Sequence, residues 1–189
     1  MEAITFITGN TGKASLISQY LDFPIIHKSI DLVEIQSLDL ATIVECKAKE
    51  AYRQIHSPVL VEDTSLRFLA MGKLPGPLIK WFLTELGTHG LCRLLDSYPD
   101  RSALAEVQFG LYDGQIFQAF SGAVEGSIAL AARGGRGFGW DAIFVPSGSS
   151  KTWAEMTDEE ARETSMRMIA LRKLETYLKL SSNHITGEP

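Results

Sequence analysis

The spacing of apolar residues changes along this chain, and each spacing predicts a different kind of element. Continuous apolar runs are typical of buried strands, whereas apolar residues three and four positions apart are typical of helices. In the first half of the chain, the pattern predicts strands at 3–8, 24–30 and 58–61 and helices at 12–22 and 38–55. It then predicts a turn at 74–77 and a helix at 78–95 that is broken near Gly87–Gly90. Strands separated by helices favour a parallel sheet with crossover helices.

After residue 100 the apolar residues alternate with polar ones, which is typical of antiparallel strands. This alternation flanks Asp113-Gly114, so a hairpin with a type I′ turn is expected there, continuing through 121–130. A glycine-rich loop at 133–139 and a short strand at 143–145 come next. Thr157 and Glu160 have the spacing of a capping box at the start of a last helix over 158–180, with a flexible tail at 181–189. The fold class predicted is mixed α/β.

Length and composition favour one domain over residues 1–180, because 189 residues with 45% apolar content can bury a core. The net charge of −5 is spread along the chain, which argues against nucleic acid as a partner. No apolar run reaches the ~18 residues of a membrane span. Two separated cysteines, Cys46 and Cys92, and an N-terminus without a leader-like pattern predict a cytoplasmic protein that does not bind membranes.

A candidate phosphate site follows the first predicted strand, in the segment Thr8-Gly9-Asn10-Thr11-Gly12-Lys13. Glycines allow the backbone to approach an anion, a helix start offers free N–H groups, and lysine adds a charge. The spacing is neither that of a P-loop nor that of a dinucleotide fingerprint. An ordinary turn between a strand and a helix is the alternative interpretation.

Carboxylates after the third predicted strand are candidates for metal binding and base catalysis. Glu62-Asp63-Thr64 follows that strand, and ligands gather at strand carboxyl ends in α/β sheets. A carboxylate there, next to a phosphate segment, can hold Mg²⁺ through oxygen and orient water, and Glu34 could supply a second ligand. A solvated acidic pair that caps the next turn, and an exposed Glu34, are the alternatives.

Several cations and aromatic residues could contact a nucleotide. Lys80 could point at a ligand or lie over the aromatic pair after it, and Lys47 lies on a helix whose charges could simply pair with each other. Phe138-Gly139-Trp140-Asp141 could sandwich a nucleobase and bind its edge, or its rings could be core residues. In the last helix Met166 lies on the apolar stripe, and Arg167 lies off it.

Five separated segments together resemble the inosine triphosphate pyrophosphatase (Ham1-like) family over about residues 3–180. They are TGNTGK (8–13), VLVEDTSL (59–66), LPGP (74–77), RGGRGFGWDAIF (133–144) and TWAEM…SMR (152–167). The segments PVLVEDTSL and LPGPLIKWFL are more similar to the eukaryotic type than to the common bacterial type. The order and spacing of five motifs are more specific than any single motif.

The resemblance implies an elongated mixed sheet with flanking helices, two lobes around a nucleotide cleft, and a homodimer. It implies hydrolysis of ITP, dITP or XTP to the monophosphate and pyrophosphate with Mg²⁺. Glu34 and Asp63 would bind the metal, Asp63 would be the general base, and Lys13 would be a catalytic cation. The substrate-binding residues implied are Thr8, Gly9, Asn10, Thr11, Gly12, Lys13, Lys47, Thr64, Lys80, Phe138, Gly139, Trp140, Asp141 and Arg167.

Two departures from the family pattern concern the base pocket. Ala161 stands where the family has lysine, and Met166 stands where it has histidine; Arg136 or Arg162 could replace the missing charge. A thioether cannot donate a hydrogen bond to the purine edge, so selectivity built on that donor is expected to fall. The alternatives are a nucleotide sensor without turnover and a triphosphatase with a different base preference.

Overall fold

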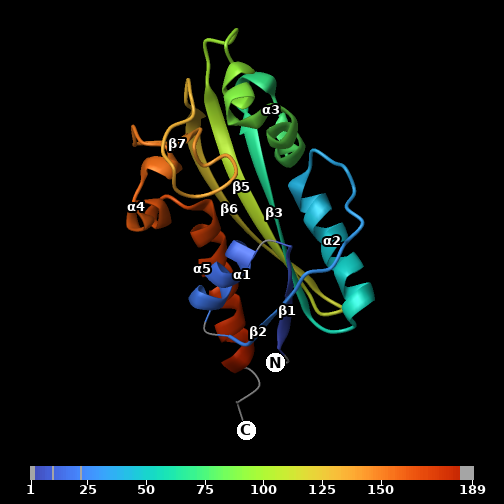
Figure 1. Cartoon of the computed structure of the whole chain (residues 1–189). Helices are drawn as coiled ribbons and strands as arrows, with labels where there is room; N and C mark the ends of the chain where they lie inside the picture. Colours follow the sequence, from blue (N-terminus) through green and yellow to red (C-terminus); the bar gives the residue numbers. More distant parts are fainter. Residues whose placement is uncertain (1–2, 10, 22, 184–189) are drawn as a thin grey trace. The chain divides into compact units, whose positions relative to one another are not determined.

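The computed structural model, drawn in Figure 1, describes residues 3–9, 11–21 and 23–183. These residues belong to two compact units. The first unit comprises the described residues of Met1–Asp63, Val107–Gly122 and Ile169–Pro189, and the second comprises Thr64–Glu106 and Ala123–Met168. Hydrogen bonds join the strands of one mixed sheet in the order β2-β1-β3-β5-β6-β7, and β4 pairs with β3. The mixed α/β fold expected from the sequence is confirmed.

The first unit is built around the parallel strands of the chain's N-terminal part. Its elements are β1 (Ile4–Ile7), α1 (Thr11–Tyr20), β2 (Ile25–Lys28), α2 (Leu40–Ile55) and the start of β3 (Val59–Phe68), with parts of β5 (Ser102–Tyr112), β6 (Phe117–Ile128) and α5 (Met166–Asn183). Strand β1 pairs in parallel with both β2 and β3. A buried apolar cluster joins the strands to α2 through Ile7, Val44, Ala48, Ala51, Val59 and Val61.

The second unit contains the rest of the long strands and the shorter elements. These are the 3₁₀ helix η1 (Leu69–Met71), β4 (Pro75–Gly76), α3 (Ile79–Arg93), β7 (Phe144–Pro146), the 3₁₀ helix η2 (Trp153–Glu155) and α4 (Asp158–Glu163). Strand β7 pairs antiparallel with β6. Helix α3 is interrupted at Gly87, whose φ of 63° and ψ of 178° are not helical, so the predicted break is confirmed.

The predictions for two turns need correction. The hairpin forms, but its loop spans residues 113–116, and only Gly114 has positive φ, whereas a type I′ turn needs two such residues. The Asp113 carboxylate accepts hydrogen bonds from the N–H groups of Gln115 and Ile116, which favours the longer loop. The segment at 74–77, predicted as a turn only, contains the two-residue strand β4.

The last predicted helix is two helices. The capping box of Thr157 and Glu160 is confirmed at the start of α4, but α4 ends at Glu163 and α5 begins at Met166. The break falls at Thr164, whose hydroxyl donates to the Glu160 carbonyl and accepts a hydrogen bond from the Trp153 indole N–H. Helix α5 then continues to Asn183, beyond the predicted end at 180, and residues 184–189 of the predicted tail lie outside the described residues.

Candidate functional site

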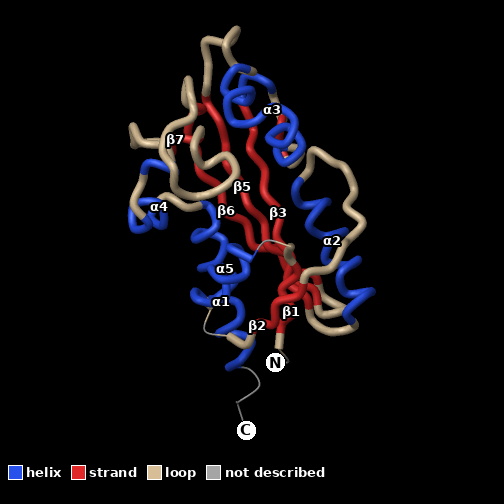
Figure 2. Tube along the Cα trace, viewed as in Figure 1, coloured by secondary structure: helices blue, strands red, loops and turns tan. Residues whose placement is uncertain are grey.

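Two carboxylates of the first unit converge on one lysine. The Lys47 ammonium, on α2, lies 2.5 Å from Glu34 Oε1 and 3.4 Å from Asp63 Oδ2. Asp63 comes from β3, and Glu34 from the long loop between β2 and α2, drawn in tan in Figure 2. The structure therefore brings together three residues that the sequence analysis had placed at separate points of the chain.

The charges around Lys47 favour its protonated form. Burial lowers the pKa of Lys47, but the neighbouring Asp63 and Glu34 carboxylates outweigh burial and raise that pKa above its usual value. Lys47 is thus a fixed positive charge between two negative ones. Its helical position follows from the apolar stripe of α2, which packs Val44, Ala48 and Ala51 against the sheet.

The position predicted for Asp63 at a strand end is wrong. Strand β3 runs through Asp63 to Phe68, so Asp63 lies in the middle of a ten-residue strand. The apolar run stops at Val61, yet Leu66 and Phe68 further along the strand are fully buried. Polar residues next to them, Ser65 and Arg67, have hydrogen-bond partners. Ser65 and Arg67 both bond to Glu106, at 3.2 Å from Oε2 and 3.1 Å from Oε1 respectively.

The two carboxylates meet the chemical requirements of a divalent cation. Mg²⁺ takes oxygen ligands and is commonly held by one or two carboxylates together with substrate phosphates. Glu34 and Asp63 already reach a common point, where the Lys47 ammonium lies. Within the described residues no group of three or more His, Cys, Asp or Glu side chains could hold a metal, so a site here would need ligands from the substrate or solvent.

Lys13 of the candidate phosphate segment pairs with Glu62, a buried carboxylate to which the family resemblance assigns no role. Its ammonium lies 3.0 Å from Glu62 Oε1, and the Lys13 and Glu62 side chains are 19% and 1% exposed. The sequence showed Glu62 only as one half of an acidic pair. The signal in the sequence that could have identified it is a charged residue placed directly after a buried apolar run.

The rest of the phosphate segment leads from β1 into α1. The Thr8 N–H donates to the Lys28 carbonyl, and the Thr8 carbonyl bonds with His27 Nε2 at 2.8 Å. Gly9 and Gly12 are exposed, and α1 begins at Thr11. Asn10 lies outside the described residues, and so does the side chain of Thr11. The strand, turn and helix predicted for this segment are confirmed, and phosphate binding stays a prediction.

In the second unit, three residues predicted to contact the base lie together. The Phe138 N–H donates to Asp141 Oδ2 at 2.8 Å, and the Arg167 guanidinium lies 5.7 Å from the centre of the Phe138 ring. Burial raises the pKa of Asp141, although the Phe138 N–H and the Arg167 charge oppose this change. Gly137 has φ of 72°, and a Cβ there would lie 2.3 Å from Asp141 Oδ2, so glycine is needed at this turn.

The two aromatic residues of this loop differ in their surroundings. Phe138 is 50% exposed, whereas Trp140 is 8% exposed and its ring centre lies 5.6 Å from that of Trp153 and 5.9 Å from that of Phe144. Trp140 is therefore a packing residue of the second unit, as the alternative interpretation had it, and direct stacking of Trp140 on a base stays a prediction. Gly139 between them is exposed, with φ of 66°.

The remaining predicted contacts, Lys80 and Thr64, also belong to the second unit. Lys80 is exposed near the start of α3, and its ammonium lies 5.9 Å from the centre of the Trp81 ring. Lys80 therefore lies near its aromatic neighbour, as one of the two interpretations had it, and contact of Lys80 with a ligand stays a prediction. Thr64 is half-buried on β3, directly after Asp63.

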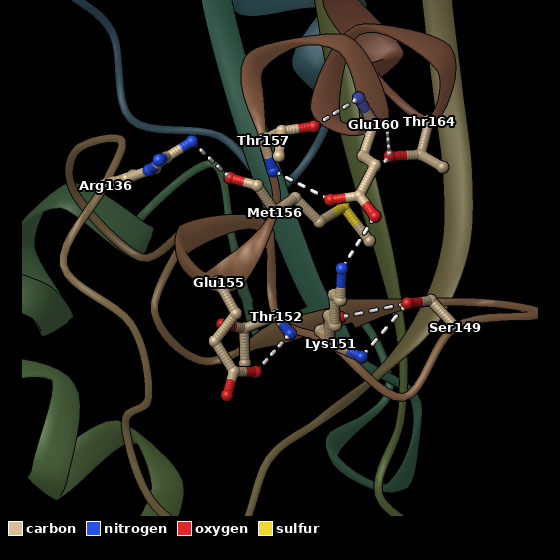
Figure 3. Close-up of polar contacts among 9 residues, drawn as sticks. All are labelled: Arg136, Ser149, Lys151, Thr152, Glu155, Met156, Thr157, Glu160 and Thr164. Atoms are coloured by element: carbon tan, nitrogen blue, oxygen red, sulfur yellow. Dashed lines mark hydrogen bonds and ion pairs between the residues drawn. The ribbon is translucent and has the colours of Figure 1, made fainter.

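The region of the two departures is organised by consecutive capping boxes (Figure 3). Thr152 pairs with Glu155, Thr157 pairs with Glu160, and Lys151 adds an ion pair of 2.7 Å to Glu160. In Figure 3 Arg136 approaches the carbonyl of Met156, at 3.5 Å. The guanidinium is thus beside the segment that precedes α4.

The two departing residues themselves lie on adjacent helices of this region. Ala161 is half-buried on α4, and Arg162 next to it is exposed. Met166 is buried at the first position of α5. The core role predicted for Met166 from the apolar stripe is confirmed by this burial.

The sequence and the structure match known proteins over nearly their whole lengths. Residues 4–177 match the profile of the Ham1 family. An inosine triphosphate pyrophosphatase of Schizosaccharomyces pombe is 39% identical over 97% of this chain and 98% of its own. One of Scheffersomyces stipitis is 41% identical over 94% of this chain and 98% of its own. The structure of a HAM1 protein from Coxiella burnetii is similar with a TM-score of 0.86 and 25% identity, covering 95% of this chain and 99% of that one.

Proposed function

We propose that this chain, which belongs to the Ham1 family, hydrolyses non-standard purine nucleoside triphosphates such as ITP, dITP and XTP to the monophosphate and pyrophosphate. Relatives of about 40% identity that cover nearly the whole chain carry the name inosine triphosphate pyrophosphatase. The observation that carries the proposal is the convergence of the Glu34 and Asp63 carboxylates on the ammonium of the half-buried Lys47. The reaction would remove unwanted nucleotides from the pool.

The first unit would supply the metal ligands and phosphate contacts. Glu34 and Asp63 would hold Mg²⁺, which neutralises phosphate charge when bound. Lys47 would contact a phosphate oxygen once the metal competes for its two carboxylates. Lys13 and the backbone of residues 8–12 would bind phosphates at the start of α1.

Asp63 would also be the general base. Its carboxylate would take a proton from a water molecule, whose oxygen forms a bond to the α-phosphorus while the bond between that phosphorus and the bridging oxygen breaks. The electron pair leaves with pyrophosphate. Positioning and neutralisation of charge supply most of the rate in such displacements.

The second unit would supply the contacts to the base. Phe138 is the exposed ring available for stacking, and Asp141 and Arg167 lie beside it with hydrogen-bonding groups. Gly139 would allow close approach of the base, while Trp140 would hold the loop in place by packing against Phe144 and Trp153. Thr64 and Lys80 would contact the substrate's sugar or phosphates.

The proposal is tested by measuring pyrophosphate release from ITP, dITP, XTP, GTP, ATP and a pyrimidine triphosphate with Mg²⁺. Release from ITP and XTP, abolished by EDTA, supports it. Binding of ITP without release would instead support a nucleotide sensor, and preferred release from pyrimidine substrates would support a different base preference. Orthophosphate in place of pyrophosphate would contradict the bond cleavage proposed.

Assembly and location are further parts of the proposal. We expect a homodimer in the cytoplasm, which sedimentation and cell fractionation would test. Among the described residues there is no helix with the length and apolar character required to cross a bilayer.

A further inference from the structure

Glu62 carries a buried charge on β3, directly after three apolar residues. The preceding residues Val59, Leu60 and Val61 are fully buried, and the Glu62 side chain is as inaccessible as theirs. A carboxylate in such surroundings is costly unless it is paired. Its partner is Lys13, in the first turn of α1.

Glu62 and Asp63 point to opposite faces of the sheet, because successive side chains of a strand alternate. Glu62 reaches Lys13 of α1, and Asp63 reaches Lys47 of α2. Consecutive residues of β3 thus each hold a lysine that would contact phosphate. Strand β3 is the common support for both cations.

Stability alone does not explain a carboxylate at this position. Replacing a buried ion pair by apolar residues of similar volume is often neutral or stabilising. The pair does fix the end of a lysine side chain, which is otherwise a flexible four-carbon stem with many rotamers. Holding that ammonium in place before a ligand arrives lowers the entropy lost on binding.

We propose that Glu62 is a positioning residue, which holds the Lys13 ammonium at the start of α1 for contact with the substrate's phosphates. Glu62 does not itself touch the nucleotide. This inference rests on the proposed function for the identity of the ligand. It gives Glu62 a role different from the metal binding or base catalysis considered for the pair Glu62-Asp63.

The test compares Glu62→Gln with Glu45→Gln as a matched control, since Glu45 also pairs with a lysine, Lys49, but at 2.5 Å on the exposed face of α2. Loss of a charge-assisted contact predicts that Glu62→Gln lowers kcat/KM for ITP about tenfold, mainly through KM. Glu45→Gln should leave kcat/KM unchanged. Gln has nearly the size of Glu, so the substitution should leave no cavity. Thermal unfolding of each variant shows whether a lower kcat/KM comes from less folded protein or from loss of positioning.

A double-mutant cycle with Lys13→Ala decides whether Glu62 acts through Lys13. If it does, adding Glu62→Gln to the Lys13→Ala variant lowers kcat/KM by less than about twofold. If Glu62→Gln lowered kcat/KM in the Lys13→Ala background as much as in the wild type, the proposal would be overturned. Tighter ITP binding by Glu62→Gln would also overturn it, because Glu62 would then be competing with phosphate.

Glu62→Met tests whether the pair is needed for stability. If it is not needed, Glu62→Met should unfold at no lower temperature than Glu62→Gln.

Failure of the proposed function would be recognised separately. If the wild-type protein released no pyrophosphate from any triphosphate, calorimetric binding of ITP and of inosine in EDTA would replace the kinetics. Glu62→Gln should then weaken binding of ITP but not of inosine, and only when Lys13 is present. Equal weakening of both ligands would contradict the positioning role whatever the reaction.

Discussion

Replacing Lys47 by methionine tests whether this lysine holds the two candidate metal ligands together. Methionine keeps the apolar stem and removes the ammonium that lies 2.5 Å from Glu34 and 3.4 Å from Asp63. The two carboxylates would then face each other without a cation between them. We expect the variant to be less stable than the wild type when no divalent metal is present.

The size of this loss follows from the exposure of the three side chains, which is 15% for Lys47, 45% for Glu34 and 24% for Asp63. Breaking a fully buried ion pair costs about 3–5 kcal/mol, whereas an exposed pair contributes about 0–1 kcal/mol. Solvent screening at Glu34 and Asp63 places this cluster between the limits, at about 1–2 kcal/mol. A domain of this size loses about 2–4 °C in Tm per kcal/mol, so we expect a decrease of about 2–8 °C in EDTA.

Magnesium should reverse part of this loss. In the wild type a metal must compete with the Lys47 ammonium for both carboxylates, but in the variant it meets no such competitor. Free Mg²⁺ at ten times its dissociation constant adds about 1.4 kcal/mol to the stability of the protein that binds it. We therefore expect a larger increase in Tm with Mg²⁺ for Lys47→Met than for the wild type.

The assay is thermal unfolding followed by circular dichroism, in EDTA and across a series of MgCl₂ concentrations. Lys49→Met is the matched control, because Lys49 lies on the same helix and pairs with Glu45, which is not a residue of the candidate site. Its Tm and its response to Mg²⁺ should equal those of the wild type. A Lys47→Met variant as stable as the wild type in EDTA, or with the same response to Mg²⁺, would refute the reasoning.

Three further predictions concern individual residues of the candidate site. Asp63→Asn should lower the rate of pyrophosphate release from ITP by 10²–10⁴-fold with the fold retained, as loss of a general base does; kcat within about tenfold of the wild type would argue against that role. Because burial raises the pKa of folded Asp141 above its unfolded value, its stabilising contribution is fully present below about pH 3.9 and is lost as pH rises through the folded pKa. Denaturant unfolding from pH 7 to pH 4 should therefore show the wild type gaining stability relative to Asp141→Asn, and a constant difference would contradict the shift. Since Met166 is buried, Met166→His should lower Tm and leave the ratio of kcat/KM for ITP over GTP nearly unchanged, whereas a restored preference for ITP would show that residue 166 faces the base.

Local sequence signals predicted most of the elements because each depends on neighbouring residues. The capping box of Thr157 and Glu160 needs only three-residue spacing, and the break at Gly87 needs only a residue that accepts positive φ. The apolar run of β1 and the stripe of α2 similarly predicted a parallel strand and a packed helix. The family motifs added the expected fold and reaction.

Where the sequence prediction was wrong, more distant residues decided the structure. Strand β3 continues past the polar pair after Val61 because Glu106, on another strand, provides a partner for Ser65 and Arg67. The last helix divides at Thr164, whose hydroxyl accepts a hydrogen bond from the Trp153 indole. Neither partner is visible in the local pattern, since both contacts depend on how the chain folds back.

The sequence by itself determined the mixed α/β class, the order of the elements and the residue types available for phosphate, metal and base contacts. Only the tertiary structure decided which of these residues are partners: Lys13 with buried Glu62, Lys47 with Glu34 and Asp63, and Phe138 with Arg167 while Trp140 packs inside. The physical reason is that periodicity specifies which face of an element is buried, whereas the pairing of charges and rings depends on contacts between segments far apart in the chain.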